Sequence, residues 1–259
     1  MLENDETHAL APMVRKLSTW RPLDTADRQA VLSLPFITRS FSAHQHIIRE
    51  GDRTKYSTLL TSGFAFRHKM AGNGGRQIMA IHMRGDVVDL QNSLLGAADH
   101  SVQMLTAGDV ALIPIEAVQK LAFERPAVGR AMWYETLVDG SIFREWMLRI
   151  GRRDARTRIS HLLCEFALRM ETAGLGTTCE YEMPITQEQL ADAVGLTPVH
   201  VNRTLKALEA DRLIKRDKRR IWITDWKKLA GTADFHPRYL HLNARQTMPA
   251  TEAHNPELA

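Results

Sequence analysis

The side chains best suited to chemistry lie between residues 184 and 220, where polar and cationic residues alternate with apolar ones. Arg203 carries a guanidinium that can hydrogen-bond O6 and N7 of guanine together, and His200 and Asn202 can bond other base edges. Hydroxyl, amide and ammonium groups nearby suit phosphate oxygens. We therefore predict a surface that binds nucleic acid, formed by Thr186, Gln187, Thr197, Val199, His200, Asn202, Arg203, Lys206, Lys218 and Arg219.

A first short helix is expected just before these residues. Thr186 is a good N-cap, and Gln189 three residues later completes a capping box, so the helix should span 187–194. Gly195 follows, where a tight turn needs a residue without a Cβ atom. The helix should therefore end there.

A second helix begins directly after that turn. Thr197 can cap it, and Pro198 suits the first helical position. Apolar residues recur at helical spacing on its inward side, at Val201, Leu205 and Leu208. The pattern predicts a helix-turn-helix in which residues 197–207 form the recognition helix.

A basic β-hairpin is expected behind the recognition helix, with strands at 212–215 and 220–223. Its cations are Lys215, Arg216, Lys218, Arg219 and Arg220. Residues 151–230 carry 15 Lys and Arg against 11 Asp and Glu, which accounts for the net charge of +4. We predict a winged helix over 151–228 with its wing beside phosphates. The alternative is a helical packing turn followed by a solvated charge run.

The sequence pattern of residues 36–115 is typical of an antiparallel β-roll. Turn signals such as Glu-Gly-Asp and Arg-Gly-Asp recur roughly every 8–12 residues, which is typical of a barrel or jelly roll. Asn73-Gly74 is the clearest hairpin, because both residues tolerate positive φ. Strands are expected at His46–Arg49, Tyr56–Leu60, Ala65–His68, Gln77–His82 and Ala111–Ile115.

Helices should flank the roll. Residues 1–35 predict two, at 10–17 and 25–34, and residues 116–123 predict another short one. A further amphipathic helix is expected over 159–170. The predicted fold class is therefore α+β.

A long helix is predicted over 126–150, completing a helical segment 116–150. Its apolar residues cover more than the single stripe that one core needs. We expect the roll to cover one face and a second copy of the chain to cover the other, with Ile142 and Trp146 in that contact. The alternative is burial within one large domain. A basic hinge is expected at 151–158.

Together these features resemble the Crp–Fnr transcription regulators, over about residues 20–228. The most specific stretch is ITQEQLADAVGLTPVHVNRTLKALEADRLI, supported by the roll turns EGD, SG, RGD and AGD. The resemblance implies a homodimer that binds inverted repeats in double-stranded DNA. It makes RNA polymerase a candidate partner and implies a ligand or redox cofactor in the roll of most members.

Two positions of the recognition helix bear on the DNA site. The resemblance gives Arg203 the role of the family's guanine-reading arginine. A glutamate common in the family corresponds to Val199, which cannot accept a hydrogen bond but can touch a thymine methyl group. The half-site should therefore differ from that of better-known members.

The effector site that the resemblance implies is degenerate in this chain. The glutamate that holds the ribose in cyclic-nucleotide members corresponds to Leu90, and the arginine that pairs with the phosphate corresponds to His100, while Ser101 is retained. Cyclic AMP binding is therefore not expected. Two cysteines beyond the roll cannot repeat the four-cysteine cluster of oxygen-sensing members. We predict no cofactor and an effector that is unidentified or absent.

An enzyme is the main alternative. His44, His46 and Glu50 match the ligand spacing of cupin metal sites, and two histidines with a carboxylate suit Fe(II), Mn(II) or Zn(II). The flanking glycines of cupins are missing and no later histidine completes the site, so a non-enzyme without a metal is favoured. A second alternative is a nucleotide-binding sensor that acts on a protein partner. Cys164 suits a core, and Cys179 is the more reactive candidate thiol.

The composition bears on whether the chain folds, crosses a membrane or is secreted. The chain has 259 residues, of which 44% are apolar, enough to build cores. No run reaches the roughly 18 apolar residues of a membrane span. An acidic start and only two cysteines favour the cytoplasm. Residues 229–259 are predicted to be a disordered tail.

Overall fold

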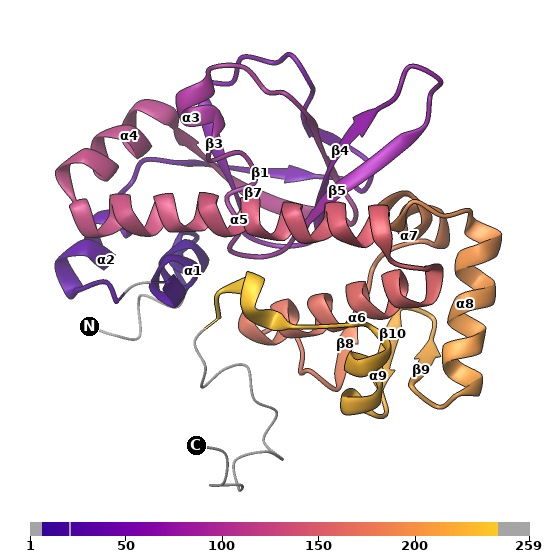
Figure 1. Cartoon of the computed structure of the whole chain (residues 1–259). Coiled ribbons are helices and arrows are strands. Elements are labelled where there is room, and N and C mark those ends of the chain that lie inside the picture. Colours follow the sequence, from indigo (N-terminus) through magenta and orange to yellow (C-terminus); the bar gives the residue numbers. More distant parts are fainter. Residues whose placement is uncertain (1–6, 21, 243–259) are drawn as a thin grey trace, which may run out of the picture.

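The computed structural model describes residues 7–20 and 22–242. A β-roll lies along one side of the long helix α5 (Pro126–Arg152), and the winged helix lies at its C-terminal end (Figure 1). Helices α1 (Ala11–Trp20) and α2 (Thr25–Leu32) pack against the other side of α5. Among these residues, no helix combines the length and apolar character that crossing a membrane requires.

The roll consists of two antiparallel sheets. The first has the order β1-β7-β3, with bounds Ile37–Phe41, Gly108–Pro114 and Tyr56–Leu60. The second has the order β2-β6-β4-β5, with bounds His46–Ile48, Ser101–Met104, Ala65–Met70 and Arg76–His82. The predicted antiparallel roll is thus confirmed. Strands β1 and β6 were not expected, and β1 offers little apolar pattern because only Phe41 in it is buried.

A core between the two sheets contains Phe41, Ile48, Leu60, Ala65, Val88, Ala98, Val102, Met104 and Val110. The β4–β5 hairpin closes at the predicted Asn73-Gly74 turn, but only Gly74 has positive φ, at 83°. Asn73 instead accepts a hydrogen bond from the Gly75 amide at 3.0 Å through its side-chain oxygen. The turn therefore uses the asparagine as a local acceptor rather than for its conformational freedom.

The helices predicted before and after the roll in the sequence are present. Asp24 caps α2 by accepting a hydrogen bond from the Asp27 amide at 2.7 Å. After β7 come α4 (Ile115–Glu124) and α5, and the short α3 (Asn92–Leu95) lies within the roll. A second core joins α1, α2, α4 and α5 through Leu10, Met13, Val14, Leu17, Val31, Val118, Leu121, Val128, Ala131 and Met132.

Helix α5 has two apolar faces, as predicted from its sequence. One is buried within the chain through Val128, Ala131, Met132, Val138 and Trp146. The other exposes Trp133, Leu137, Phe143, Met147 and Leu148. The expectation that Ile142 and Trp146 face a second copy is wrong. Both pack into the core that α6 (Ala155–Thr172) shares with α5, and only 2% of Trp146 is exposed.

The junction between α5 and α6 is shorter than the expected basic hinge at 151–158. Helix α5 continues to Arg152, and α6 begins at Ala155. Asp154 caps α6 by accepting a hydrogen bond from the Thr157 amide at 2.8 Å. Only Arg153 and Asp154 lie between the helices, because this aspartate starts the second helix directly after the first one ends.

The C-terminal domain is a winged helix. It contains β8 (Glu180–Glu182), α7 (Gln187–Val194), α8 (Pro198–Ala210), β9 (Ile214–Asp217) and β10 (Arg220–Ile223). The three strands form one antiparallel sheet in the order β8-β10-β9. Strand β8 was not expected.

The chain remains ordered after the wing. Helix α9 (Trp226–Thr232) and the 3₁₀ helix η1 (Pro237–Leu240) follow, and Leu229, Ala233, Phe235 and Leu240 are buried in the core around α6. The predicted disorder of residues 229–259 is therefore wrong for 229–242, because these apolar residues pack against α6. Residues 243–259 lie outside the described part of the chain.

A buried carboxylate joins these elements. Glu165 on α6 accepts hydrogen bonds from Trp146 Nε1 at 2.9 Å and from the Tyr239 hydroxyl at 2.9 Å. The fully buried guanidinium of Arg149 lies 3.8 Å from the same carboxylate and 4.1 Å from the centre of the Trp146 ring. A charge buried this completely depends on its countercharge and on the aromatic face.

Glu165→Gln should destabilise the protein by about 3–5 kcal/mol, because it leaves the Arg149 charge buried without a countercharge. Chemical denaturation measures this change. Adding Arg149→Met should recover part of the loss, since it removes the uncompensated charge. Glu124→Gln, on an exposed face of α4, is the matched control and should change stability little. A double variant no more stable than Glu165→Gln alone would contradict this account.

Candidate nucleic-acid interface

Local capping positions the first helix of the interface as the sequence predicts. The Thr186 hydroxyl accepts a hydrogen bond from the Gln189 amide at 3.1 Å, and the Gln189 side chain accepts one from the Thr186 amide at 2.9 Å. Gly195 ends α7 with φ of 65°, and a Cβ there would lie 3.3 Å from a methyl group of Ile150. The turn therefore requires glycine for its conformation and has little room for a side chain.

The recognition helix α8 separates its apolar and polar residues cleanly. Thr197 caps it by accepting a hydrogen bond from the His200 amide at 3.3 Å. Its inward face buries Val201, Leu205 and Leu208, as predicted. Its outward face exposes Val199, Arg203 and Lys206, with 80% of Val199 accessible. An arginine and a lysine thus stand next to an apolar contact point on one open surface.

The two helices are linked at this surface. The Asn202 side-chain amide donates to the Gln187 side-chain oxygen at 3.0 Å, and both Asn202 and His200 are half-buried. Thr186, Gln187 and Thr197 are exposed at the N-terminal ends of α7 and α8. Helix N-termini carry unpaired amides and partial positive charge, which suits phosphate oxygens. The structure therefore brings the predicted residues of α7 and α8 together.

The wing presents fewer open cations than the sequence indicates. Arg216 forms an ion pair with Glu209 at 2.7 Å, Arg220 pairs with Glu180 at 3.0 Å, and Lys215 lies 5.6 Å from the centre of the Trp222 ring. Lys218 and Arg219 are exposed at the tip of the hairpin. Among the described residues no carboxylate pairs with either of them, so they are the wing cations best placed to contact phosphates.

One contact that the sequence did not predict docks α7 onto the roll. Arg76 pairs with Asp192 at 2.8 Å, and the Gln77 side-chain amide donates to the Asp192 carbonyl at 2.7 Å. The partners lie more than a hundred positions apart, so no local pattern could indicate the pairing. The contact fixes the helix-turn-helix against strand β5.

His100 stands at the position where the resemblance predicts an arginine in the effector site. His100 Nδ1 lies 2.5 Å from the Asp99 carboxylate, and burial lowers the pKa of His100 because the charged ring is poorly solvated there. Leu90 is buried, and the Ser101 hydroxyl accepts a hydrogen bond from the Glu50 amide at 3.0 Å. The site offers no fixed positive charge at the position of the family's arginine.

An acidic residue lies directly beside Leu90. Asp89 is fully buried and accepts hydrogen bonds from the Thr58 amide at 2.7 Å and from the Thr58 hydroxyl at 3.1 Å. Burial raises the pKa of Asp89 to about 7, the hydrogen bonds opposing the shift. This carboxyl group is directed at Thr58 of strand β3.

The residues of the alternative metal site have other surroundings. Glu50 forms an ion pair with Lys69 at 2.7 Å, and the His46 ring lies 5.8 Å from the His68 ring, centre to centre. His44 lies in an exposed turn with positive φ. Within the described residues, no three side chains of histidine, cysteine, aspartate or glutamate are grouped so that they could hold a metal ion.

The cysteines differ as expected. Cys164 is buried in the α6 core, and burial raises the pKa of its thiol, which keeps it protonated and unreactive. Cys179 is exposed.

Two family models match the chain, one to each part. A model described as a cyclic nucleotide-binding domain matches residues 38–125, and one described as a Crp-like helix-turn-helix domain matches residues 157–232. The chain belongs to the Crp–Fnr family of transcription regulators. Helices α7 and α8 and the β9–β10 wing of this Crp–Fnr chain all lie within the part that the Crp-like helix-turn-helix model matches.

Two transcriptional activators are similar to this Crp–Fnr chain in sequence, and one solved structure is similar in fold. It is 29% identical to the transcriptional activator protein FnrL of Cereibacter sphaeroides over 75% of this chain and 79% of that protein. It is 22% identical to the transcriptional activator protein Anr of Pseudomonas protegens over 87% of this chain and 90% of that one. The solved structure of FixK2 from Bradyrhizobium japonicum aligns with a TM-score of 0.70 and 24% identity, over 77% of this chain and 98% of that chain.

Cyclic AMP should not bind this protein saturably at physiological concentration, because Leu90 and His100 replace the two anchoring groups that the resemblance implies. Isothermal titration calorimetry provides the measurement. The double variant Leu90→Glu/His100→Arg supplies both anchors and should bind more tightly than the wild type. Micromolar binding of cyclic AMP by the wild type would refute this account of the site.

Proposed function

We propose that this regulator binds an inverted-repeat site in double-stranded DNA as a homodimer, in the cytoplasm. The observation that supports it is the outward row on α8, where Val199, Arg203 and Lys206 are exposed while the opposite side of the helix is buried. Arg203 reads guanine, and Lys218 and Arg219 at the wing tip contact the phosphates beside it. Thr186, Gln187 and Thr197 hold the phosphates at the helix ends, and His200 and Asn202 reach neighbouring base edges.

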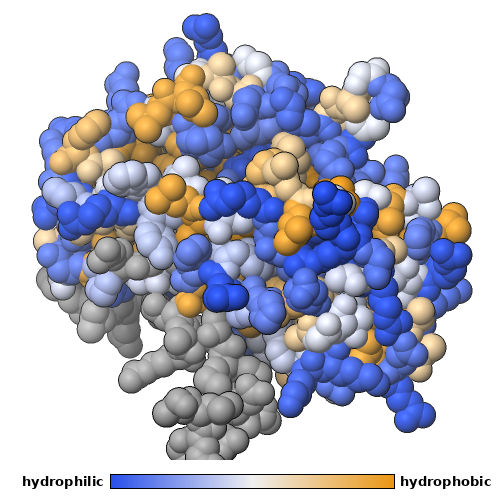
Figure 2. Space-filling view, viewed as in Figure 1, coloured by the Kyte–Doolittle hydropathy of each residue, from blue (hydrophilic) through white to orange (hydrophobic). Residues whose placement is uncertain are grey.

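The second face of α5 supports the dimer. Trp133, Leu137 and Met147 lie on one side of this 27-residue helix at a spacing close to the heptad repeat. Their exposed fractions are 68%, 57% and 61%, although they are large apolar side chains. Figure 2 shows apolar residues along the row that α5 occupies in Figure 1. A second copy of α5 would cover this face and remove it from water.

Twofold symmetry then determines the form of the DNA site. Two copies related by a twofold axis present their recognition helices in opposite directions, so the half-sites form an inverted repeat. Helix-turn-helix dimers place half-site centres about one helical turn apart, roughly 34–36 Å.

Arg203→Ala should lower the affinity for the specific site by about 1–3 kcal/mol and leave nonspecific binding nearly unchanged, because it removes a contact to base edges. Arg219→Ala should weaken binding to all sequences alike, because it removes a contact to phosphate. Fluorescence anisotropy with specific and random duplexes measures both affinities. An unchanged ratio of specific to nonspecific affinity in Arg203→Ala would contradict the proposal that Arg203 reads a base.

Leu137→Glu/Met147→Glu should give monomers that keep a folded winged helix and lose most operator affinity, since charges at these positions cannot be buried against a second α5. Sedimentation velocity reports the oligomeric state, and circular dichroism reports folding. Phe123→Glu replaces an apolar residue that is 82% exposed on α4, away from this face, and is the matched control. A wild-type monomer at micromolar concentration, or a double variant that still dimerises, would overturn the dimer.

A further inference from the structure

A cavity of about 80 Å³ lies where the roll, α1, α5, α6 and the C-terminal segment meet. Holding one water molecule takes roughly 10–15 Å³ of such space, so the cavity has room for several waters or for a small organic molecule. Part of its wall is apolar, formed by Met83, Val87, Leu90, Val138, Ile142 and Leu240. The rest of the wall is unusually rich in charge.

Positive charge exceeds negative charge around this cavity. The cations that line it are Arg15, Lys16, Arg67, Arg84 and Arg169, and the carboxylates are Asp86, Glu135 and Asp139. Three of the cations are paired with these carboxylates, through Lys16–Asp86 at 2.8 Å, Arg67–Asp139 at 2.6 Å and Arg169–Asp86 at 3.3 Å. The two others, Arg15 and Arg84, have no carboxylate partner within the described part of the chain.

Two buried nitrogens at the cavity have no acceptor or donor opposite them. Arg84 Nε and His82 Nε2 are both inaccessible to water and make no hydrogen bond among the described residues. The His82 side chain is only 6% exposed. Leaving Arg84 Nε unsatisfied costs free energy, which a ligand with acceptor oxygens would recover.

We propose that this cavity binds a small organic anion, a carboxylate or phosphate on a short apolar body. Arg84 and Arg15 neutralise the anionic group, and the apolar wall contacts the carbon body. A charge-assisted hydrogen bond from a guanidinium to an oxyanion is among the stronger polar contacts in proteins.

This cavity is not the site at which the resemblance places a cyclic nucleotide. His100 and Ser101 do not line the cavity, and Leu90 is shared only as part of its apolar wall. Helices α1 and α6 and the segment at Leu240 contribute instead. The anion is therefore held between the roll and the first helix of the winged-helix domain.

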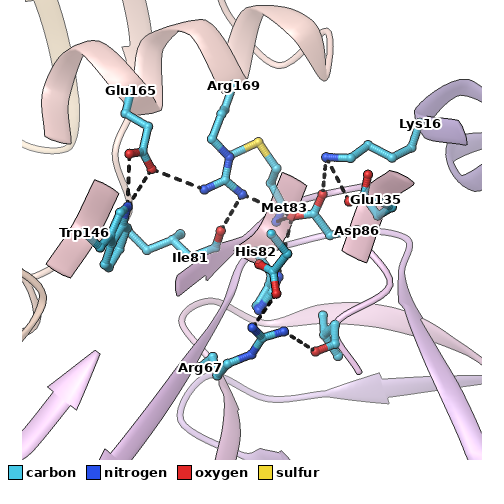
Figure 3. A network of polar contacts seen from close by, with 12 residues as sticks. Lys16, Arg67, Ile81, His82, Met83, Asp86, Glu135, Trp146, Glu165 and Arg169 are labelled. Atoms are coloured by element: carbon cyan, nitrogen blue, oxygen red, sulfur yellow. Dashed lines mark hydrogen bonds and ion pairs between the residues drawn. The ribbon is translucent and has the colours of Figure 1, made fainter. Parts of the chain in front are cut away.

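Figure 3 shows the polar contacts through which Arg169, which lines the cavity, connects α6 with the roll, α1 and α5. Arg169 on α6 donates to the Ile81 carbonyl at 2.7 Å and pairs with Asp86, which also pairs with Lys16 of α1. Arg169 lies 3.7 Å from Glu165, the carboxylate that holds Trp146 of α5. An anion beside Arg169 competes with Asp86 for the guanidinium and so changes how α6 is held against the roll.

Calorimetric titration of the full-length protein without DNA tests the site directly, using glutarate, butyl phosphate and inorganic phosphate. Saturable binding of glutarate or butyl phosphate is expected, and tighter binding than inorganic phosphate, because only the organic anions use the apolar wall. Arg84→Ala should weaken it by about tenfold or more. Arg28→Ala removes an exposed arginine of α2 outside the cavity and should leave binding unchanged.

Three results would overturn the proposal. These results are no saturation by either organic anion at millimolar concentration, inorganic phosphate binding as tightly as both, or unchanged affinity in Arg15→Ala/Arg84→Ala. Thermal unfolding of each variant verifies that it is folded.

The coupling to DNA rests on the proposed function and is measured separately. The bound anion should change the affinity for a duplex selected by the protein from randomised DNA, and Arg84→Ala should abolish that change. A saturated cavity with unaltered DNA affinity would refute the coupling alone, whereas failure to select any duplex would refute the proposed DNA site and leave the anion site standing.

Discussion

The carboxylate of Glu165 receives hydrogen bonds from two different parts of the chain inside a core that excludes water. Trp146 comes from α5 and Tyr239 from the segment after the wing, while Arg149 supplies the buried positive charge. Because unpaired charges are so costly in this environment, the partners must remain together. The angle between α5 and α6, and with it the position of the recognition helix, depends on this contact.

Helix α5 connects the two ends of the molecule. One of its faces is buried within the chain and the other is exposed. Its inward face completes the cores around the roll and α6, so the helix is fixed before any partner arrives. Its outward face exposes large apolar side chains, among them Trp133 and Met147. In the proposed dimer, a rigid helix of this kind would set the separation of the two DNA-binding domains through its length and its position along the twofold axis.

The features that the sequence predicts well are local ones. Thr186, Gly195 and Thr197 specify caps and a turn within a few residues, so they predict the bounds of α7 and the start of α8 correctly. Contacts across long separations carry no such pattern. Arg216 has the sequence context of a wing cation, although Glu209 lies beside it in the fold. The ordered segment after residue 228 resembles a polar tail because its few apolar residues lack helical periodicity.

The Arg76–Asp192 pair that docks α7 onto the roll remains partly in contact with solvent, with about a quarter of each side chain accessible. Dissolved salt screens such a pair, and in the proposed DNA complex dissolved cations also compete with Lys218 and Arg219 for phosphate. Ionic strength therefore acts twice on this molecule, once on the binding surface and once on the attachment that orients it. The two effects add. Osmotic stress changes the concentration of ions in the cell and would therefore change the affinity for DNA through both.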